Sequence, residues 1–238
     1  MKKITVSLGL ILTLSFGTTF NDGYEAFEKG DYQSALSIYE YLAAKNDSKA
    51  LYNLGDIYSH GYGVKQDYKK ALKYFEKSAE QGLAEAQYNM GFFNYEGKIV
   101  QQDYKKAIEW YKKSASQGFG LAKYNLGNMY ANGYGVKQDY KIAIEWLEKA
   151  ANQNILEAQH NLGVMYRDEI GVKQDYKKAI EYFQKAANQD FAESQHNLGV
   201  MYENGYGVKQ DYKIAKELYK KACDGGIQIA CYHYRLLN

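Results

Sequence analysis

Residues 48–83 of the chain read SKALYNLGDIYSHGYGVKQDYKKALKYFEKSAEQGL, and this pattern returns every 36 residues. Two independent markers carry the period. The first is the Asp of an Asp-Tyr dipeptide and the second is the Gly of Asn-Leu-Gly or Asn-Met-Gly; they lie at Asp31, Asp67, Asp103, Asp139, Asp175 and Asp211, and at Gly55, Gly91, Gly127, Gly163 and Gly199. A fixed interval of this length is the signature of a repeat architecture. We therefore divide the chain into repeats at about 22–47, 48–83, 84–119, 120–155, 156–191 and 192–227, with a closing helix over 228–238.

Each repeat is predicted to contain two helices, called helix A and helix B. Their apolar or small residues, taken from the repeat 48–83, are Ala50, Leu54, Ile57 and Tyr58 for helix A and Tyr68, Ala71, Leu72 and Phe75 for helix B. These residues have the spacing of one helical face in each helix. Asp67 lies just before helix B, where an Asp side chain caps a helix N-terminus. The sequence therefore predicts an all-α fold of stacked helix pairs.

The Gly of helix A lies in mid-helix, where Gly costs about 1 kcal/mol relative to Ala. Its recurrence implies a compensating close approach of helix B. We expect the small residues of helix B to supply that approach, because two small faces pack tightly. These residues are Ala35, Ala71, Ala107, Ala143, Ala179 and Ala215.

The composition excludes some classes of protein. Of the 238 residues, 46% are hydrophobic and 16% aromatic, which is too much for intrinsic disorder. Lys and Arg number 30 against 28 acidic residues, so the net charge is only +2. Because no strongly basic stretch is present to neutralise phosphates, nucleic acid is not an expected partner.

The N-terminus has the pattern of a secretory signal peptide. Lys2 and Lys3 precede an apolar stretch from Ile4 to Gly17, which is shorter than the roughly 20 residues needed to span a bilayer. We predict a signal peptide over 1–19 and a mature chain over 20–238 without a stable membrane span, located in the periplasm or outside the cell.

The helix A block A-x-A-Q-Y-N-L-G, the loop G-Y-G-V-K-Q-D-Y-K-x-A and the closing K-A-A resemble the Sel-one-like repeat (SLR) family, a relative of the tetratricopeptide repeat. The resemblance covers nearly everything after residue 19. It implies a right-handed superhelix of helix pairs with a concave face lined by helix A, folded as a single domain over 20–238. The first repeat departs from the pattern, because its turn at Gly30 lacks the longer Gly-Tyr-Gly loop. Lys98 and Glu169 replace a loop Tyr and a loop Gly, so those two loops are expected to differ locally.

Cys223 and Cys231 are the two cysteines of the chain, and an even count in an exported protein favours a disulfide over a free or redox-active pair. Their C-x7-C spacing resembles the Helicobacter cysteine-rich branch of the SLR family, in which such pairs staple neighbouring helices. No metal site and no cofactor are predicted. His160 and His196 replace Tyr in their repeats, which indicates half-buried aromatic positions rather than metal ligands.

The resemblance to tetratricopeptide stacks places ligand-facing residues of helix A near the Gly marker. These residues are Tyr52, Asp56, Tyr88, Phe92, Tyr124, Asn128, His160, Val164, His196 and Val200. Their mixture of aromatic, amide and apolar groups suits an extended peptide or a cell-envelope glycan. The adjacent Asn column, Asn53, Asn89, Asn125, Asn161 and Asn197, either binds ligand backbone or ties helices together. We predict a monomeric scaffold or adaptor for protein or envelope partners.

Two other functions stay open. The cysteine-rich branch is described as containing β-lactamases or penicillin-binding proteins, but no Ser in the chain is followed three residues later by Lys, as the acylating serine enzymes require. Nitrocefin turnover would separate that reading from a binding function. A secreted effector directed at a host is the other alternative.

Overall fold

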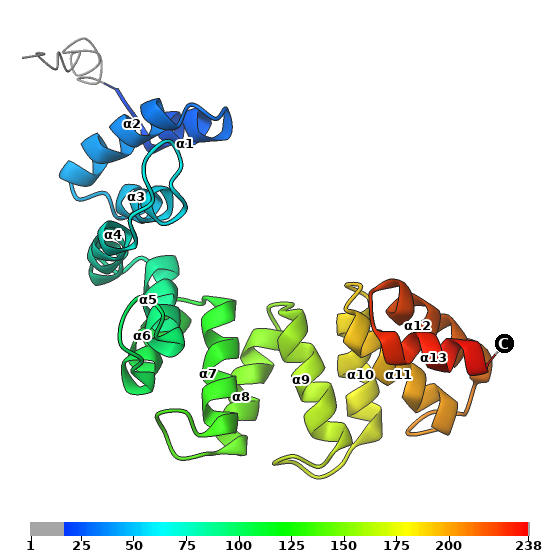
Figure 1. Ribbon diagram of the computed structural model, residues 1–238. Helices are drawn as coiled ribbons and strands as arrows, with labels where there is room; N and C mark the ends of the chain where they lie inside the picture. Colours follow the sequence, from blue (N-terminus) through cyan, green and yellow to red (C-terminus); the bar gives the residue numbers. More distant parts are fainter. Residues whose placement is uncertain (1–16, 238) are drawn as a thin grey trace, which may run out of the picture. The chain divides into compact units, whose positions relative to one another are not determined.

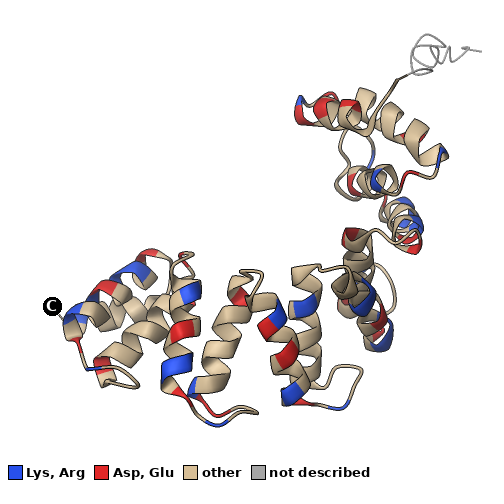
Figure 2. Ribbon diagram, turned by 180° about the vertical axis from the view of Figure 1, so that it is seen from behind, with Lys and Arg blue, Asp and Glu red and all other residues tan. Residues whose placement is uncertain are grey.

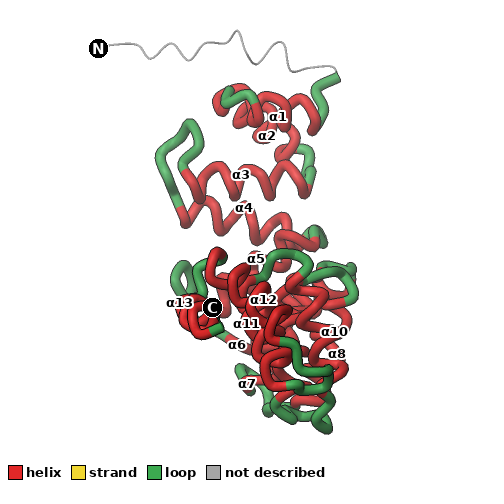
Figure 3. The backbone as a smooth tube through the Cα atoms, turned by 90° about the vertical axis from the view of Figure 1, so that its right-hand side faces the viewer, coloured by secondary structure: helices red, strands yellow, loops and turns green. Residues whose placement is uncertain are grey.

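The structure is a computed structural model that describes residues 17–237, and within that range it contains α-helices and no strand (Figures 1 and 3). The helices are α1 (Phe20–Glu28), α2 (Tyr32–Ala44), α3 (Ser48–His60), α4 (Tyr68–Glu80), α5 (Ala84–Glu96), α6 (Tyr104–Ser116), α7 (Gly120–Asn132), α8 (Tyr140–Ala151), α9 (Leu156–Arg167), α10 (Tyr176–Ala187), α11 (Ala192–Asn204), α12 (Tyr212–Asp224) and α13 (Gln228–Leu236). Odd-numbered helices are helix A and even-numbered helices are helix B. The predicted all-α class of stacked helix pairs is confirmed.

The chain divides into two compact bodies, which we call the N-terminal body (Met1–Gln117, with α1 to α6) and the C-terminal body (Gly118–Asn238, with α7 to α13). Within each body every helix packs against the next helix along the chain. The predicted signal peptide falls largely on residues 1–16, which lie outside the described residues. Among the helices that the structure describes, none is both long and apolar enough to cross a membrane.

Helix B begins at the same side chain in every repeat. The Asp carboxylate that precedes each helix B accepts a hydrogen bond from a backbone N–H inside the first turn, at 3.0 Å between Asp67 Oδ1 and the Lys70 nitrogen. The same bond starts helix B at Asp31, Asp103, Asp139, Asp175 and Asp211. The predicted cap is therefore confirmed in all six repeats.

Helix A ends at a left-handed residue. That residue is Gly61, Gly97, Gly133 and Gly205 in four repeats, with φ between 69° and 76°. The Gln of the following loop then caps the helix, because its Nε2 donates to a carbonyl seven residues earlier, as from Gln66 to Ser59 at 2.7 Å. In the repeat 156–191 the residue at the Gly position is Glu169, whose φ is 60°. This residue adopts a conformation that favours Gly.

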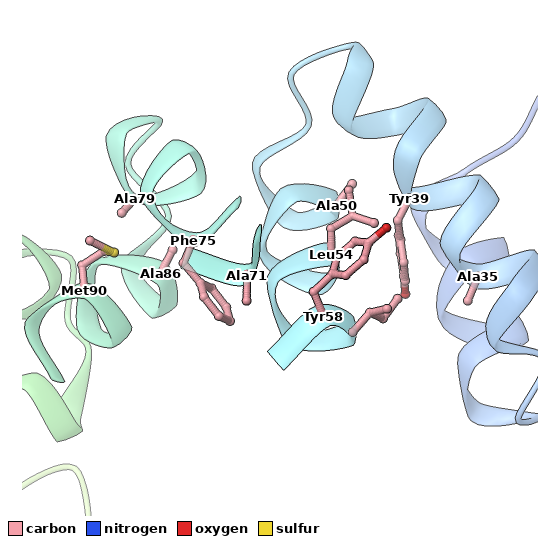
Figure 4. Packing of buried hydrophobic residues seen from close by; sticks show 11 residues of the cluster. Ala35, Tyr39, Ala50, Leu54, Tyr58, Ala71, Phe75, Ala79, Ala86 and Met90 are labelled. Carbon is pink, nitrogen blue, oxygen red and sulfur yellow. The ribbon is translucent and has the colours of Figure 1, made fainter. Parts of the chain in front are cut away.

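The Gly of helix A packs against a large side chain of helix B. A Cβ on Gly55 would lie 2.8 Å from the Phe75 ring, and one on Gly91 would lie 2.6 Å from the Tyr111 ring. Leu147, Phe183 and Tyr219 meet Gly127, Gly163 and Gly199 in the same way. The expectation that the Ala column is the counterpart was wrong. Figure 4 shows Ala71 and Phe75 on α4; both are buried, and Phe75, one turn after Ala71 on the same face, is the side chain that lies against Gly55.

The last helix is joined to its neighbour covalently. Cys223 near the end of α12 and Cys231 in α13 form a disulfide, with their Cα atoms 4.6 Å apart. The bond closes the described part of the C-terminal body, where no later helix B covers α13. Bonds of this kind persist in oxidising environments.

Candidate functional site

Five of the ten predicted groove residues lie between helix A and helix B. They are Tyr52, Tyr88, Tyr124, His160 and His196, and all five are half-buried. The Tyr52 ring lies edge-on to Phe75 with ring centroids 5.4 Å apart, and the His160 ring lies 5.6 Å from Phe183. These side chains therefore contact the same buried residues that cover the Gly column.

Burial disfavours the charged form of the two histidines of this set. His160 Nδ1 lies 2.9 Å from the Ser194 hydroxyl, and its ring also contacts Phe191. Burial lowers the pKa of His160, and Arg167 acts in the same direction, while Glu193 opposes it. Burial lowers the pKa of His196 as well. Among the described residues no group of three His, Cys, Asp or Glu side chains is arranged to hold a metal ion.

Three residues of the Asn column each tie a helix A to the helix A before it. Asn89 Nδ2 lies 3.5 Å from the Tyr52 hydroxyl, and Asn161 Nδ2 donates to Asn128 Oδ1 at 3.1 Å. Asn197 Oδ1 accepts from Arg167 at 2.9 Å. These contacts support the interpretation that the Asn column joins adjacent repeats.

Predicted groove residues line a recess in the N-terminal body. It has a volume of about 310 Å³ and lies among α3, α4, α5 and the loops that follow α3 and α5. Its lining consists of Asp56, Ser59, His60, Gln66, Tyr68, Ala71, Leu72, Phe75, Asn89, Phe92, Phe93 and Ile99. Phe92 is 41% exposed, the largest exposure among the predicted aromatic groove residues. We call this surface the first recess.

The same recess occurs in the C-terminal body two repeats later. It has a volume of about 270 Å³ and is lined by Asn128, Ala131, Asn132, Gln138, Tyr140, Leu147, Asn161, Val164, Met165 and Ile170. All but one of these residues lie 72 positions after a residue that lines the first recess, as Asn128 follows Asp56 and Val164 follows Phe92. We call this surface the second recess. The repeat backbone thus builds one kind of recess twice, with acidic and aromatic groups in the first and amides and aliphatic groups in the second.

The structure identifies two residues of the first repeat that the 36-residue period does not reveal. A Cβ on Gly23 would lie 2.7 Å from the Tyr39 ring, so Gly23 is the Gly marker of the first repeat, although it precedes Gly55 by 32 residues rather than 36. The first loop is shorter by those four residues. In this register Tyr24, which is 50% exposed, takes the position of Asp56 and Phe92. A search for Asn-Leu-Gly or Asn-Met-Gly at a 36-residue interval could not find it, because the segment reads Asn-Asp-Gly and lies four residues out of register.

These features define the class of the protein as an α-helical repeat protein: helix pairs, a Gly column and capped loops. Proteins of this class serve in general as scaffolds for protein–protein interaction. The Sel1 repeat family model matches residues 48–83, 84–119, 120–155, 156–191 and 192–227. The chain therefore belongs to the Sel1 repeat family.

Solved structures agree with this assignment. A protective antigen of uropathogenic Escherichia coli that displays an SLR fold is 34% identical over 92% of this chain, with a TM-score of 0.86, and the chain spans 48% of that protein. A Sel1 repeat protein from Oxalobacter formigenes is 33% identical over 89% of this chain and 86% of its own, with a TM-score of 0.82. Cysteine rich protein B of Helicobacter pylori is 28% identical over 57% of this chain and 97% of its own, with a TM-score of 0.45. Among curated proteins, none matches the chain.

Proposed function

We propose that this chain is an exported scaffold that binds extended peptide segments of partner proteins in the recesses on helix A. The observation that carries the proposal is the recurrence of one recess two repeats apart, at Asp56 and Phe92 and again at Asn128 and Val164. Because equivalent helix A residues line a recess in each body, each recess suits a short extended peptide segment of its own.

The size and chemistry of the recesses support a peptide. Volumes of about 270 and 310 Å³ lie at the lower end of the range for ligand sites, so each recess accommodates one or two side chains rather than a cofactor. Apolar surface forms most of the first lining, whereas the second is more polar, and Asn, Gln, Asp and Ser groups at these surfaces provide donors and acceptors for a peptide backbone.

A peptide selection tests this function. Random peptides displayed on phage are selected on the purified, oxidised chain, and the enriched sequences are measured by fluorescence anisotropy. We expect Phe92→Ala and Val164→Ala together to weaken binding at least tenfold while the far-UV circular dichroism is unchanged. The matched control is Glu109→Ala, an exposed residue on helix B of the same repeat as Phe92. Equal binding by the double variant and the control would contradict the recess assignment.

A second experiment tests the native partner and the export. A photo-crosslinking amino acid at position 92 or 164 in the producing cell is expected to trap a protein, whereas the same group at position 109 is not. Trapping of glycan strands instead would mean that the ligand is a glycan and not a peptide. The N-terminal residue of the chain purified from the exported fraction is expected to be Phe20, the first residue of the predicted mature chain. An N-terminus at Met1 would contradict cleavage of a signal peptide.

A further inference from the structure

The three helix A positions that face outward in the N-terminal body form an aromatic, acidic, aromatic series. Tyr24, Asp56 and Phe92 occupy equivalent places on α1, α3 and α5, as the packing of Gly23, Gly55 and Gly91 shows. Tyr24 is 50% exposed, Phe92 is 41% exposed, and the Asp56 side chain is 40% exposed. The equivalent residues of the C-terminal body are Asn128, Val164 and Val200, which carry no charge.

Asp56 lies at two recesses at once. Besides the first recess, it lines a smaller recess of about 100 Å³ together with Tyr24, Phe27, Glu28, Tyr39 and Asn53. Asp56 and Glu28 are the acidic residues among the two linings, and neither lining includes a Lys or an Arg. The Asp56 carboxylate therefore lies between two apolar recesses, with a second carboxylate on the side of α1.

One side chain fixes the Asp56 carboxylate in place. His60 Nδ1 lies 3.1 Å from Asp56 Oδ1 and 3.0 Å from the Asp56 carbonyl oxygen, one helical turn earlier. The imidazole stacks on Tyr62 with ring centroids 5.1 Å apart, so its own orientation is set by the loop. The His60 ring therefore holds the Asp56 carboxylate in one orientation.

We infer that the N-terminal body selects a Lys or Arg side chain of the bound peptide, which pairs with Asp56 while apolar residues on either side enter the two flanking recesses. This inference rests on the proposed function. The cation meets a carboxylate that shares a recess with each of the exposed rings Tyr24 and Phe92, and both a carboxylate and aromatic rings favour a positive charge. The second recess lacks this charge, because Asn128 stands in place of Asp56, so it accepts an uncharged side chain.

The test uses synthetic peptides that differ at one position. Fluorescein-labelled peptides with a central Lys, norleucine or Glu between Leu residues are titrated against the purified chain, and anisotropy is recorded at low and physiological salt. We expect the Lys peptide to bind about tenfold more tightly than the norleucine peptide, since a hydrogen bond to a charged group is stronger than one between neutral groups. The preference should shrink as salt rises.

Two substitutions at equivalent positions isolate the carboxylate. Asp56→Asn is expected to abolish the preference for Lys over norleucine. Asn128→Asp, its counterpart 72 residues later, is expected to create the preference in the second recess even when Asp56 is Asn. Both changes are nearly isosteric, and unchanged circular dichroism verifies folding.

The outcomes distinguish the role inferred for Asp56 from the proposed peptide-binding function. Binding of all peptides without a Lys preference, or a preference that survives Asp56→Asn, overturns the assignment of Asp56 and leaves the peptide-binding function standing. Failure of these peptides and of the selected phage peptides to bind at all overturns both proposals.

Discussion

Substitution of Gly163 by Ala tests whether the Gly column exists to admit the large side chain of helix B. Helix propensity alone predicts that Ala stabilises α9 by about 1 kcal/mol. The structure predicts the opposite sign. A Cβ at position 163 would lie 2.6 Å from Cδ1 and Cε1 of Phe183, roughly 1 Å inside ordinary carbon contact. Phe183 is fully buried and is held on other sides by His160 and Arg167.

The magnitude follows from two opposing terms. Overpacking of a buried ring costs about 1–3 kcal/mol, and the propensity gain offsets about 1 kcal/mol of it. We therefore expect Gly163→Ala to lower the free energy of unfolding by up to about 2 kcal/mol. In a Phe183→Ala background the overlap disappears, so the same substitution should raise the free energy of unfolding by about 1 kcal/mol.

The assay is urea unfolding followed by far-UV circular dichroism on the four chains of this double-mutant cycle. The sign change between the two backgrounds is the diagnostic result, because a propensity effect alone is the same in both. Stabilisation by Gly163→Ala in the wild-type background, or an equal effect in both backgrounds, would refute the close-approach explanation.

Three further predictions concern other parts of the fold. Glu169→Gly should raise the free energy of unfolding by about 1 kcal/mol in urea, because Glu169 has a φ of 60° that Gly adopts without strain; destabilisation would contradict this. Burial lowers the pKa of His160 and of His196 in the folded chain, so their contribution to stability is present above the ordinary His pKa of about 6.5 and is lost as the pH falls through the lowered pKa. His160→Tyr with His196→Tyr should flatten the loss of urea resistance between about pH 7 and pH 5, and an unchanged pH profile would count against the burial explanation. Replacing Cys223 and Cys231 by Ala should cost roughly 2–3 kcal/mol from the lost loop closure, seen as faster hydrogen exchange in α13, whereas unchanged exchange there would show that packing alone holds the helix.

The cooperativity of the whole stack remains a prediction. The sequence repeat favours one domain over 20–238, while the structure contains two compact bodies whose boundary along the chain lies between Gln117 and Gly118. The double-mutant cycle also tests this prediction. Gly163 lies in the C-terminal body, so its substitution alters the unfolding of the N-terminal body only if the two bodies unfold together.

The sequence by itself determined the features that depend on neighbours close in the chain. The helices of each pair and the caps of the Asp67 type follow from residues within one or two turns of each other. The cap, for example, is a local hydrogen bond between Asp67 and the Lys70 nitrogen. The resemblance of the repeats also led to the helix A positions Asp56, Phe92, Asn128 and Val164, which do line recesses.

Only the tertiary structure decided which residues of a repeat are covered. Tyr52 and Phe92 both belong to the predicted groove set, yet Tyr52 packs against Phe75 while Phe92 remains 41% exposed. The sequence period assigned the Gly marker to an Ala partner, but a ring one turn further along fills that space. Tyr24 was missed because a loop four residues shorter shifts the first repeat out of register. The exposure of a helix A side chain depends on the side chains that a neighbouring helix packs against it. The residue pattern of one helix does not indicate the volume or the direction of those side chains.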